Sequence, residues 1–362
     1  MFKCKPDYEE AQKMIDAFWD NEDAGRPIVH MTYPKPGAQP FPSKEYPSLE
    51  ERWLDVEYRT EQLAHDIENT VFVAEAMPAI HPNLGPELFS SWAGCPYVYG
   101  EETTWSEPCV HDWETDGDKA VVDMSHPLFK KLEEFTGLLL ERGKGSFIVG
   151  LTDFHPGGDH LAALRDPQTL ATDLLEYPEF VKAKLASSYP EYFAAYDHFV
   201  DMLSTAGMPI TSWITLTAQK SMYIPSNDFS YMISKEMFDE FFLDGIIGEC
   251  RHYDRSVYHL DGTGALRHLD SLLAIPELNA VQWLPGAGHE NVVPWIGVFK
   301  KILAAGKSAM VYPQNMKELR LLMDTLPARG LHLSIGWGIT SADDAMDLMR
   351  IIEKWPRGND LK

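Results

Sequence analysis

The chain has 362 residues, enough for two ordinary domains or for one α/β barrel. It carries 31 Lys and Arg against 55 Asp and Glu, and the resulting net charge of −24 argues against a surface for duplex DNA or an anionic membrane. The N-terminus lacks the apolar run of a signal peptide, and no stretch approaches the roughly 20 apolar residues of a membrane span. The 4 dispersed cysteines indicate neither a disulfide framework nor a structural zinc motif. We therefore expect a cytoplasmic protein.

Helical and strand-like patterns alternate along the sequence. Apolar residues at helical spacing predict an opening helix over 7–20. The predicted strands are 28–32, 70–75, 146–151, 209–216, 256–261, 280–284, 308–312 and 331–335, with helical stretches between them. This order predicts one α/β domain over 1–362, a (β/α)8 TIM barrel with an additional N-terminal helix. A doubly wound sheet is the alternative, but no GxGxxG follows the first strand and no Walker sequence occurs.

Residues 78–126 interrupt this alternation. The segment lacks clean periodicity and is rich in acidic and aromatic residues, among them Trp92. Long loops inside a compact domain are usually functional or disordered, and the aromatic density argues against disorder. We expect a lid-like insertion over the C-terminal mouth of the barrel. The alternative is that the aromatic side chains only anchor an irregular segment to the rim.

Two polar residues lie at the end of the fifth predicted strand. His259 and Asp261 in SVYHLDGTGALRH lie two positions apart, so they point to the same side of an extended strand. Catalytic groups of barrel enzymes come from such strand ends. The alternative is a core histidine followed by an aspartate that caps the next helix.

Further candidates end the second and third predicted strands. Glu75 interrupts the apolar run FVAEAMP, and Asp153 and His155 follow the third strand. If these strands feed one pocket, the three side chains converge with His259 and Asp261. Several acids that close require either a bound cation or a protonated carboxyl group.

In this order, the local patterns resemble the uroporphyrinogen decarboxylase superfamily, including the corrinoid-dependent methyltransferases that share its barrel. LSIGWGI is similar to the closing strand of that family and its Gly-x-Gly turn. FVAEAMP is similar to the segment with the decarboxylase's essential Asp, with Glu75 in its place. The helix ISKEMFDEFFL is similar to the methyltransferase branch, as is His259-Leu260-Asp261 at the His-x-Cys position.

The departures from the family patterns separate its branches. The loop HMTYPKPGAQP contains Lys35 but no Arg for a polycarboxylate porphyrinogen, and Trp337 replaces the decarboxylase's His between the closing glycines. Methyltransferases of this family typically hold zinc with two cysteines and a histidine, and Asp261 and Trp337 replace both cysteines here. The remaining set of His259, Asp261 and Glu75 could hold zinc or act without a metal.

The resemblance implies a corrinoid-dependent methyltransferase of the O-demethylase type. The methyl group of an aromatic methyl ether, or of another methylated small molecule, would pass to the cobalt of a separate corrinoid protein. The alternatives are a decarboxylase of a small acid or porphyrinogen, and a non-catalytic partner of a corrinoid protein. The resemblance leaves a homodimer open. The expected catalytic residues are Glu75, Asp153, His259 and Asp261, and the expected substrate-binding residues are His30, His155, Trp92, Trp213, Asp228, Trp283 and Trp337.

Overall fold

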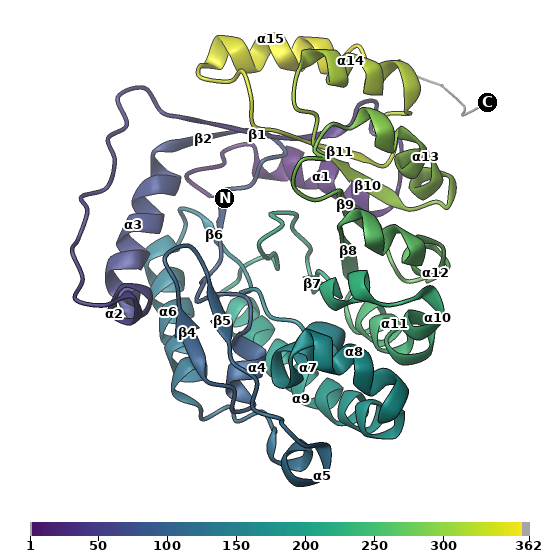
Figure 1. The fold of residues 1–362 in the computed structure, drawn as a ribbon. Coiled ribbons are helices and arrows are strands. Elements are labelled where there is room, and N and C mark those ends of the chain that lie inside the picture. Colours follow the sequence, from purple (N-terminus) through teal and green to yellow (C-terminus); the bar gives the residue numbers. More distant parts are fainter. Residues whose placement is uncertain (1, 357–362) are drawn as a thin grey trace.

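The computed structural model describes residues 2–356, and in it the helices surround a central set of strands (Figure 1). The strands are β1 (Ile28–Pro34), β2 (Thr70–Ala74), β3 (Ala79–Ile80), β4 (Tyr97–Tyr99), β5 (Thr104–Ser106), β6 (Ile148–Val149), β7 (Met222–Tyr223), β8 (Arg255–Asp261), β9 (Ala280–Leu284), β10 (Ser308–Val311) and β11 (Leu331–Ile335).

The α-helices are α1 (Tyr8–Trp19), α2 (Leu49–Leu54), α3 (Val56–Glu68), α4 (Leu88–Trp92), α5 (Trp113–Asp116), α6 (Pro127–Gly143), α7 (Gly157–Arg165), α8 (Pro167–Glu176), α9 (Pro178–Thr205), α10 (Lys235–Phe241), α11 (Leu243–His252), α12 (Leu269–Leu273), α13 (Ile296–Ala304), α14 (Met316–Thr325) and α15 (Ala342–Ile352). Short 3-10 turns cover 117–119, 228–232, 263–268 and 293–295.

The main sheet has the strand order β2-β1-β11-β10-β9-β8-β7, and every pairing in it is parallel except that of β1 with β2. A mixed α/β fold with a mainly parallel sheet is thus confirmed. Within the described residues the sheet is not closed, because β3 and β6 form a separate parallel pair. Backbone hydrogen bonds continue from that pair, with Gly150 N donating to Ile80 O and Leu151 N donating to Thr211 O. A closed eight-stranded barrel remains a prediction.

Strand β2 differs from the expected second barrel strand. It pairs antiparallel with β1, in the register His30 to Ala74, and all five of its residues are only half-buried. The apolar run at 70–75 predicts a strand buried on both faces, which the structure does not show. The antiparallel return places β2 at the edge of the sheet, and Ala74 ends it with a φ of 53°.

The expected strand at 209–216 does not form. Ile210 makes only an isolated antiparallel bridge to Ala218, and β7 pairs with β8 in its place. The physical reason is local hydrogen bonding, because the Thr211 hydroxyl donates to Leu216 O at 2.8 Å and bends the segment back. Ser212 likewise donates its hydroxyl to Leu151 O at 3.0 Å. The side chains thus satisfy carbonyl groups that a ladder would have used.

The buried apolar side chains form two clusters on opposite faces of the same strands. In β1, Val29 and Met31 belong to one cluster and Ile28 to the other. In β8, Tyr258 and Leu260 belong to the first and Val257 to the second. This alternation follows from the two-residue period of a strand, so the two clusters arise from one sheet.

The segment 78–126 is partly integrated into the fold. It begins with β3, whose pairing with β6 makes it part of the parallel core, and it continues into the fully buried α4. The rest forms the hairpin of β4 and β5, α5 and a 3-10 turn. That this segment moves as a lid remains a prediction.

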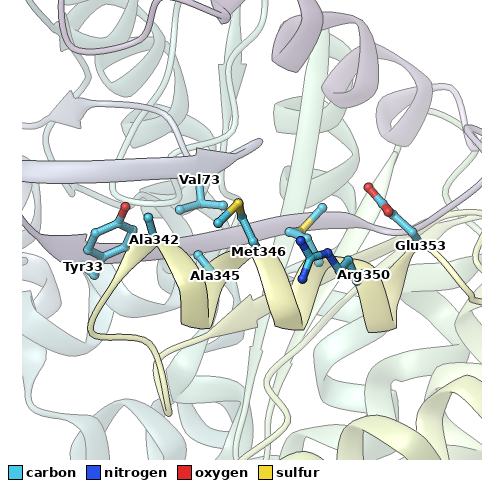
Figure 2. Close-up of a pocket in the computed structure, with 8 residues that line it drawn as sticks. Tyr33, Val73, Ala342, Ala345, Met346, Arg350 and Glu353 are labelled. Carbon is cyan, nitrogen blue, oxygen red and sulfur yellow. The ribbon is translucent and has the colours of Figure 1, made fainter.

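Within residues 2–356, no helix has both the length and the apolar character needed to cross a bilayer. A groove of about 390 Å³ lies between α15 and the β1–β2 pair, where Met346 lies beside Val73 and Ala342 lies beside Tyr33 (Figure 2). Its lining is apolar except for the Tyr33 hydroxyl, Arg350 and Glu353, so it offers little for catalysis.

Candidate active site

Polar side chains gather at the carboxyl ends of the central strands. A cavity of about 740 Å³ opens there, and segment 78–126 contributes one wall of it through Glu87, Ser90 and Ser106. Its lining also includes Asp153 and His155 after β6, Asp228 after β7, and His259 near the end of β8. The strand ends thus do bring distant polar residues together.

His259 and Asp261 at the end of β8 form one group with Asp228. Each of the three residues offers a ligand atom that lies within 4.8 Å of the other two. His259 Nε2 lies 4.0 Å from Asp228 Oδ1. Asp228 enters the group because β7 ends beside β8, and Ser226 makes a bridge to His259.

The orientation of the His259 ring is fixed by a hydrogen bond at its Nδ1. Its Nδ1 lies 2.6 Å from Oε1 of Gln282, on the neighbouring strand β9, and Gln282 Nε2 donates to the Tyr312 hydroxyl at 2.5 Å. An amide oxygen accepts only, so Nδ1 carries the proton and Nε2 presents its lone pair toward Asp228. Histidine ligands of metals are commonly held in this way.

This donor set could hold a zinc ion. One imidazole nitrogen and two carboxylate oxygens are ligand types that zinc accepts, and three protein ligands would leave a position open for substrate. Bound there, zinc would act as a Lewis acid on the leaving group of the substrate. Glu75, which was expected in this set, is not part of it.

Glu75 is instead held in a buried ion pair. Both of its carboxylate oxygens accept from Arg26 at 2.8 Å, and Oε2 also accepts from the backbone N–H of Val29 at 2.8 Å. These contacts fasten the end of β2 to β1. The predicted cluster therefore contains Asp228 and not Glu75. The ion pair of Glu75 could not be predicted from the apolar run around it, because Arg26 lies 49 positions away in the sequence.

Asp153 and His155 form an ion pair that lines the cavity. His155 Nε2 lies 2.6 Å from Asp153 Oδ1. Burial opposes protonation of His155, but Asp153, Asp159 and Glu249 outweigh it and raise its pKa to about 9. Burial likewise opposes ionisation of Asp153, yet His155 and His81 hold its pKa below the usual value. The proton of this pair therefore resides on His155.

Two acids with raised pKa values, the half-buried Asp159 and the buried Glu249, influence this ion pair. Burial, together with Asp228, raises the pKa of Asp159 to about 6. Burial raises the pKa of Glu249 in α11 to about 8 against the opposing effect of His155. Asp159 accepts from Phe229 N at 2.9 Å, which ties α7 to the loop after β7. Near neutral pH this region therefore stores a proton on Glu249 as well as on His155.

Trp213 and His30 lie along a smaller cavity of about 300 Å³ that also reaches Glu75 and Gln282. Trp213 contacts both cavities, and its ring meets the His259 ring edge-on with centroids 5.2 Å apart. His30 lies 3.3 Å from the Thr215 hydroxyl, and burial lowers its pKa to about 4.

The other expected aromatic contacts are largely structural. Trp92 in α4 is 1 % exposed and packs edge-on against Phe129, so it belongs to the core because α4 is buried on all sides. Trp337 does not line the main cavity. Its indole N–H donates to Pro313 O at 2.5 Å. Trp283 is 1 % exposed but lines a third hollow, of about 340 Å³, together with Asp261.

Several site residues escaped sequence reasoning. Gln282 was visible as a polar residue inside an apolar strand, which is a usable signal. Glu249 lies in a helix, where a polar residue by default faces solvent. Asp159 and His160 were visible as titratable residues close after the third predicted strand, but they were not included among the expected site residues. Glu87 precedes α4 in a segment without periodicity.

No family model matches the sequence. No curated protein matches it either. Among solved structures, the chain is similar to a methyltransferase from Methanosarcina mazei, with a TM-score of 0.60 and 13% sequence identity. The likeness covers 98% of this chain and 99% of that one. At this identity the match shows a shared fold over nearly the whole chain.

Proposed function

We propose that this protein is a methyltransferase that moves a methyl group from a small methylated molecule to the cobalt of a partner corrinoid protein. The observation that carries the proposal is the group of His259, Asp261 and Asp228 at the strand ends, beside a cavity large enough for a small substrate. The shared fold with a methyltransferase adds support, as does the resemblance to the corrinoid-dependent branch of the uroporphyrinogen decarboxylase superfamily. An aromatic methyl ether is one donor that such a site would accept.

The residues of the site suit a reaction in which a methyl group is attacked while the atom that it leaves is protonated. His155 carries a proton, its Nε2 is engaged by Asp153, and its buried Nδ1 has no hydrogen-bond partner among the described residues. For an ether donor, the C–O electron pair would stay on oxygen and Nδ1 would supply the proton. The methyl carbon would pass to Co(I), which provides the electron pair of the new bond.

The alternative of a decarboxylase receives less support from the site. A carboxylate substrate would enter a cavity lined by Glu87, Asp153, Asp159 and Asp228. The negative charges of these side chains would repel the substrate carboxylate in a partly buried site. We therefore retain methyl transfer as the leading function.

The test is methyl transfer to cob(I)alamin, followed through the absorbance of methyl-Co(III), with a panel of methyl ethers and methylamines. The variant His259→Ala should lower the rate about 100-fold or more, because it removes the one nitrogen donor of the group. His289→Ala, on an exposed loop, serves as the matched control and should retain the wild-type rate. Transfer that is unchanged in His259→Ala would contradict the site, and no transfer from any donor would contradict the function.

A further inference from the structure

The main cavity carries charge of essentially one sign. Its lining contains five carboxylates, Glu87, Asp153, Asp159, Asp166 and Asp228, and among the described lining residues there is no Lys or Arg. The protonated His155 is already paired with Asp153. Even with Asp228 committed to a metal, the remaining carboxylates outnumber this single cation. Such a cavity favours a cationic ligand and repels an anionic one.

A buried polar atom without a partner marks the cavity as a binding site. His160 is 1 % exposed, lines the cavity, and its Nε2 has no hydrogen-bond partner among the described residues. Its Nδ1 lies 2.9 Å from the Ser90 hydroxyl. Buried polar atoms are rarely left unpaired, so a ligand with a polar group is the expected partner of Nε2.

Aromatic and apolar surface completes the lining. Trp213 and Phe229 contribute rings, and Met232 and Ala163 contribute aliphatic surface. Contact of the Trp213 ring edge with His259 fixes the indole at the border of the site. Carboxylates together with aromatic rings are the recognised means of binding quaternary ammonium groups.

From these observations we infer that the methyl donor is a cation, a small molecule with a methylated ammonium group. The inference rests on the proposed methyl transfer and specifies its donor. The chemistry balances without an added proton, since the C–N electron pair stays on nitrogen and the product leaves as a neutral amine. The Co(I) of the partner corrinoid protein would supply the electron pair of the new bond to the methyl carbon.

The first experiment measures binding by calorimetry with choline and with 3,3-dimethylbutan-1-ol, a neutral molecule of the same shape. We expect choline to bind about tenfold more tightly, which is the size of a partly desolvated cation–π contact. Glu87→Gln and Asp159→Asn should each reduce this preference. Asp347→Asn, at an exposed position on α15, should not. Equal binding of the two molecules in the wild type, or tighter binding of 4-methoxybenzoate than of choline, would overturn the inference.

The second experiment separates this inference from the proposed function. Choline is incubated with the protein and cob(I)alamin, and methyl-Co(III) absorbance is recorded. Transfer from choline supports both. Transfer from methyl ethers without choline binding overturns the cationic donor and leaves methyl transfer intact. Charge-dependent choline binding without transfer from any donor contradicts the proposed function while supporting a cation site in the cavity.

Discussion

At the scale of single residues, the candidate site depends on side chains that hold others in place. Gln282 is the clearest case, because its amide oxygen sets the tautomer of His259 and its amide nitrogen is held by Tyr312. The chain of three side chains spans β8, β9 and the end of β10. His259 thus has a defined nitrogen free for a metal or substrate.

We predict that Gln282→Leu lowers zinc affinity and methyl transfer by about 10–100-fold, the usual effect of losing a partner behind a metal ligand. The leucine keeps the size of the side chain but cannot accept from Nδ1. Zinc content after dialysis and the transfer rate are the measurements. Gln314→Leu, at an exposed position after β10, is the control. A Gln282→Leu protein with wild-type zinc content and wild-type transfer would show that Gln282 does not position His259.

Some residues of the candidate site could be predicted from the sequence and others could not. His259 and Asp261 were predicted from the alternation of a strand, and the structure brings them together. Glu75 was misplaced because its partner Arg26 precedes β1 and the sequence gives no long-range pairing. Asp228, expected near the substrate, lies within reach of both His259 and Asp261 only because β7 ends beside β8.

At the scale of elements, the strongly periodic segments were predictable and the short ones were not. Helix α1 lies within one residue of the predicted bounds 7–20 at either end, since it has one apolar face. Strands β3 and β7 have two residues each and therefore no period to detect. The alternation at 209–216 gave a false strand, because the side-chain hydrogen bonds of Thr211 compete with the ladder.

The loops on either side of the β4–β5 hairpin are joined by a pair of thiols. Cys95 Sγ donates to Cys109 Sγ at 3.2 Å. This contact holds the pKa of Cys109 below its usual value despite burial, and Lys184 adds to the effect. Two thiols in contact, one of them with a lowered pKa, are the arrangement that forms a disulfide on oxidation.

We predict that diamide, a two-electron oxidant of dithiols, converts Cys95 and Cys109 to a disulfide. The loop that it closes would add roughly 3 kcal/mol to the free energy of unfolding. Thiol titration and peptide mapping should show loss of these two thiols, while Cys4 and Cys250 remain free. In Cys95→Ser the oxidant should change nothing. Four free thiols after treatment of the wild type would refute the prediction.

At the scale of the whole molecule, the buried acids around the cavity make stability depend on pH. The folded protein raises the pKa of Glu249 from 4.5 to about 8, mainly through burial. The folded state therefore binds more protons than the unfolded state between these values. Its stability falls as pH rises through this window and levels off above it.

We predict that Glu249→Gln removes this part of the pH dependence, because the amide cannot ionise. Between about pH 5 and pH 8 the wild type should lose stability relative to the variant, by on the order of a few kcal/mol. Urea unfolding at intervals across the range gives the difference. Glu240→Gln, on the exposed side of α10, is the matched control and should follow the wild type. Parallel curves for the wild type and Glu249→Gln would show that Glu249 ionises normally.

The pairing of β1 with β11 joins the two ends of the chain. Ile28 in β1 pairs with His332 in β11. Nearby, Arg329 contacts Asn21 across 308 positions, and the Ser308 hydroxyl in β10 donates to Phe18 O in α1 across 290. During synthesis, β1 therefore leaves the ribosome with an unpaired edge and waits until nearly the whole polypeptide has been made. Contacts this distant in sequence slow folding, and an open strand edge invites aggregation in the meantime. Efficient production of this protein should accordingly benefit from chaperones that cover the N-terminal third of the nascent chain.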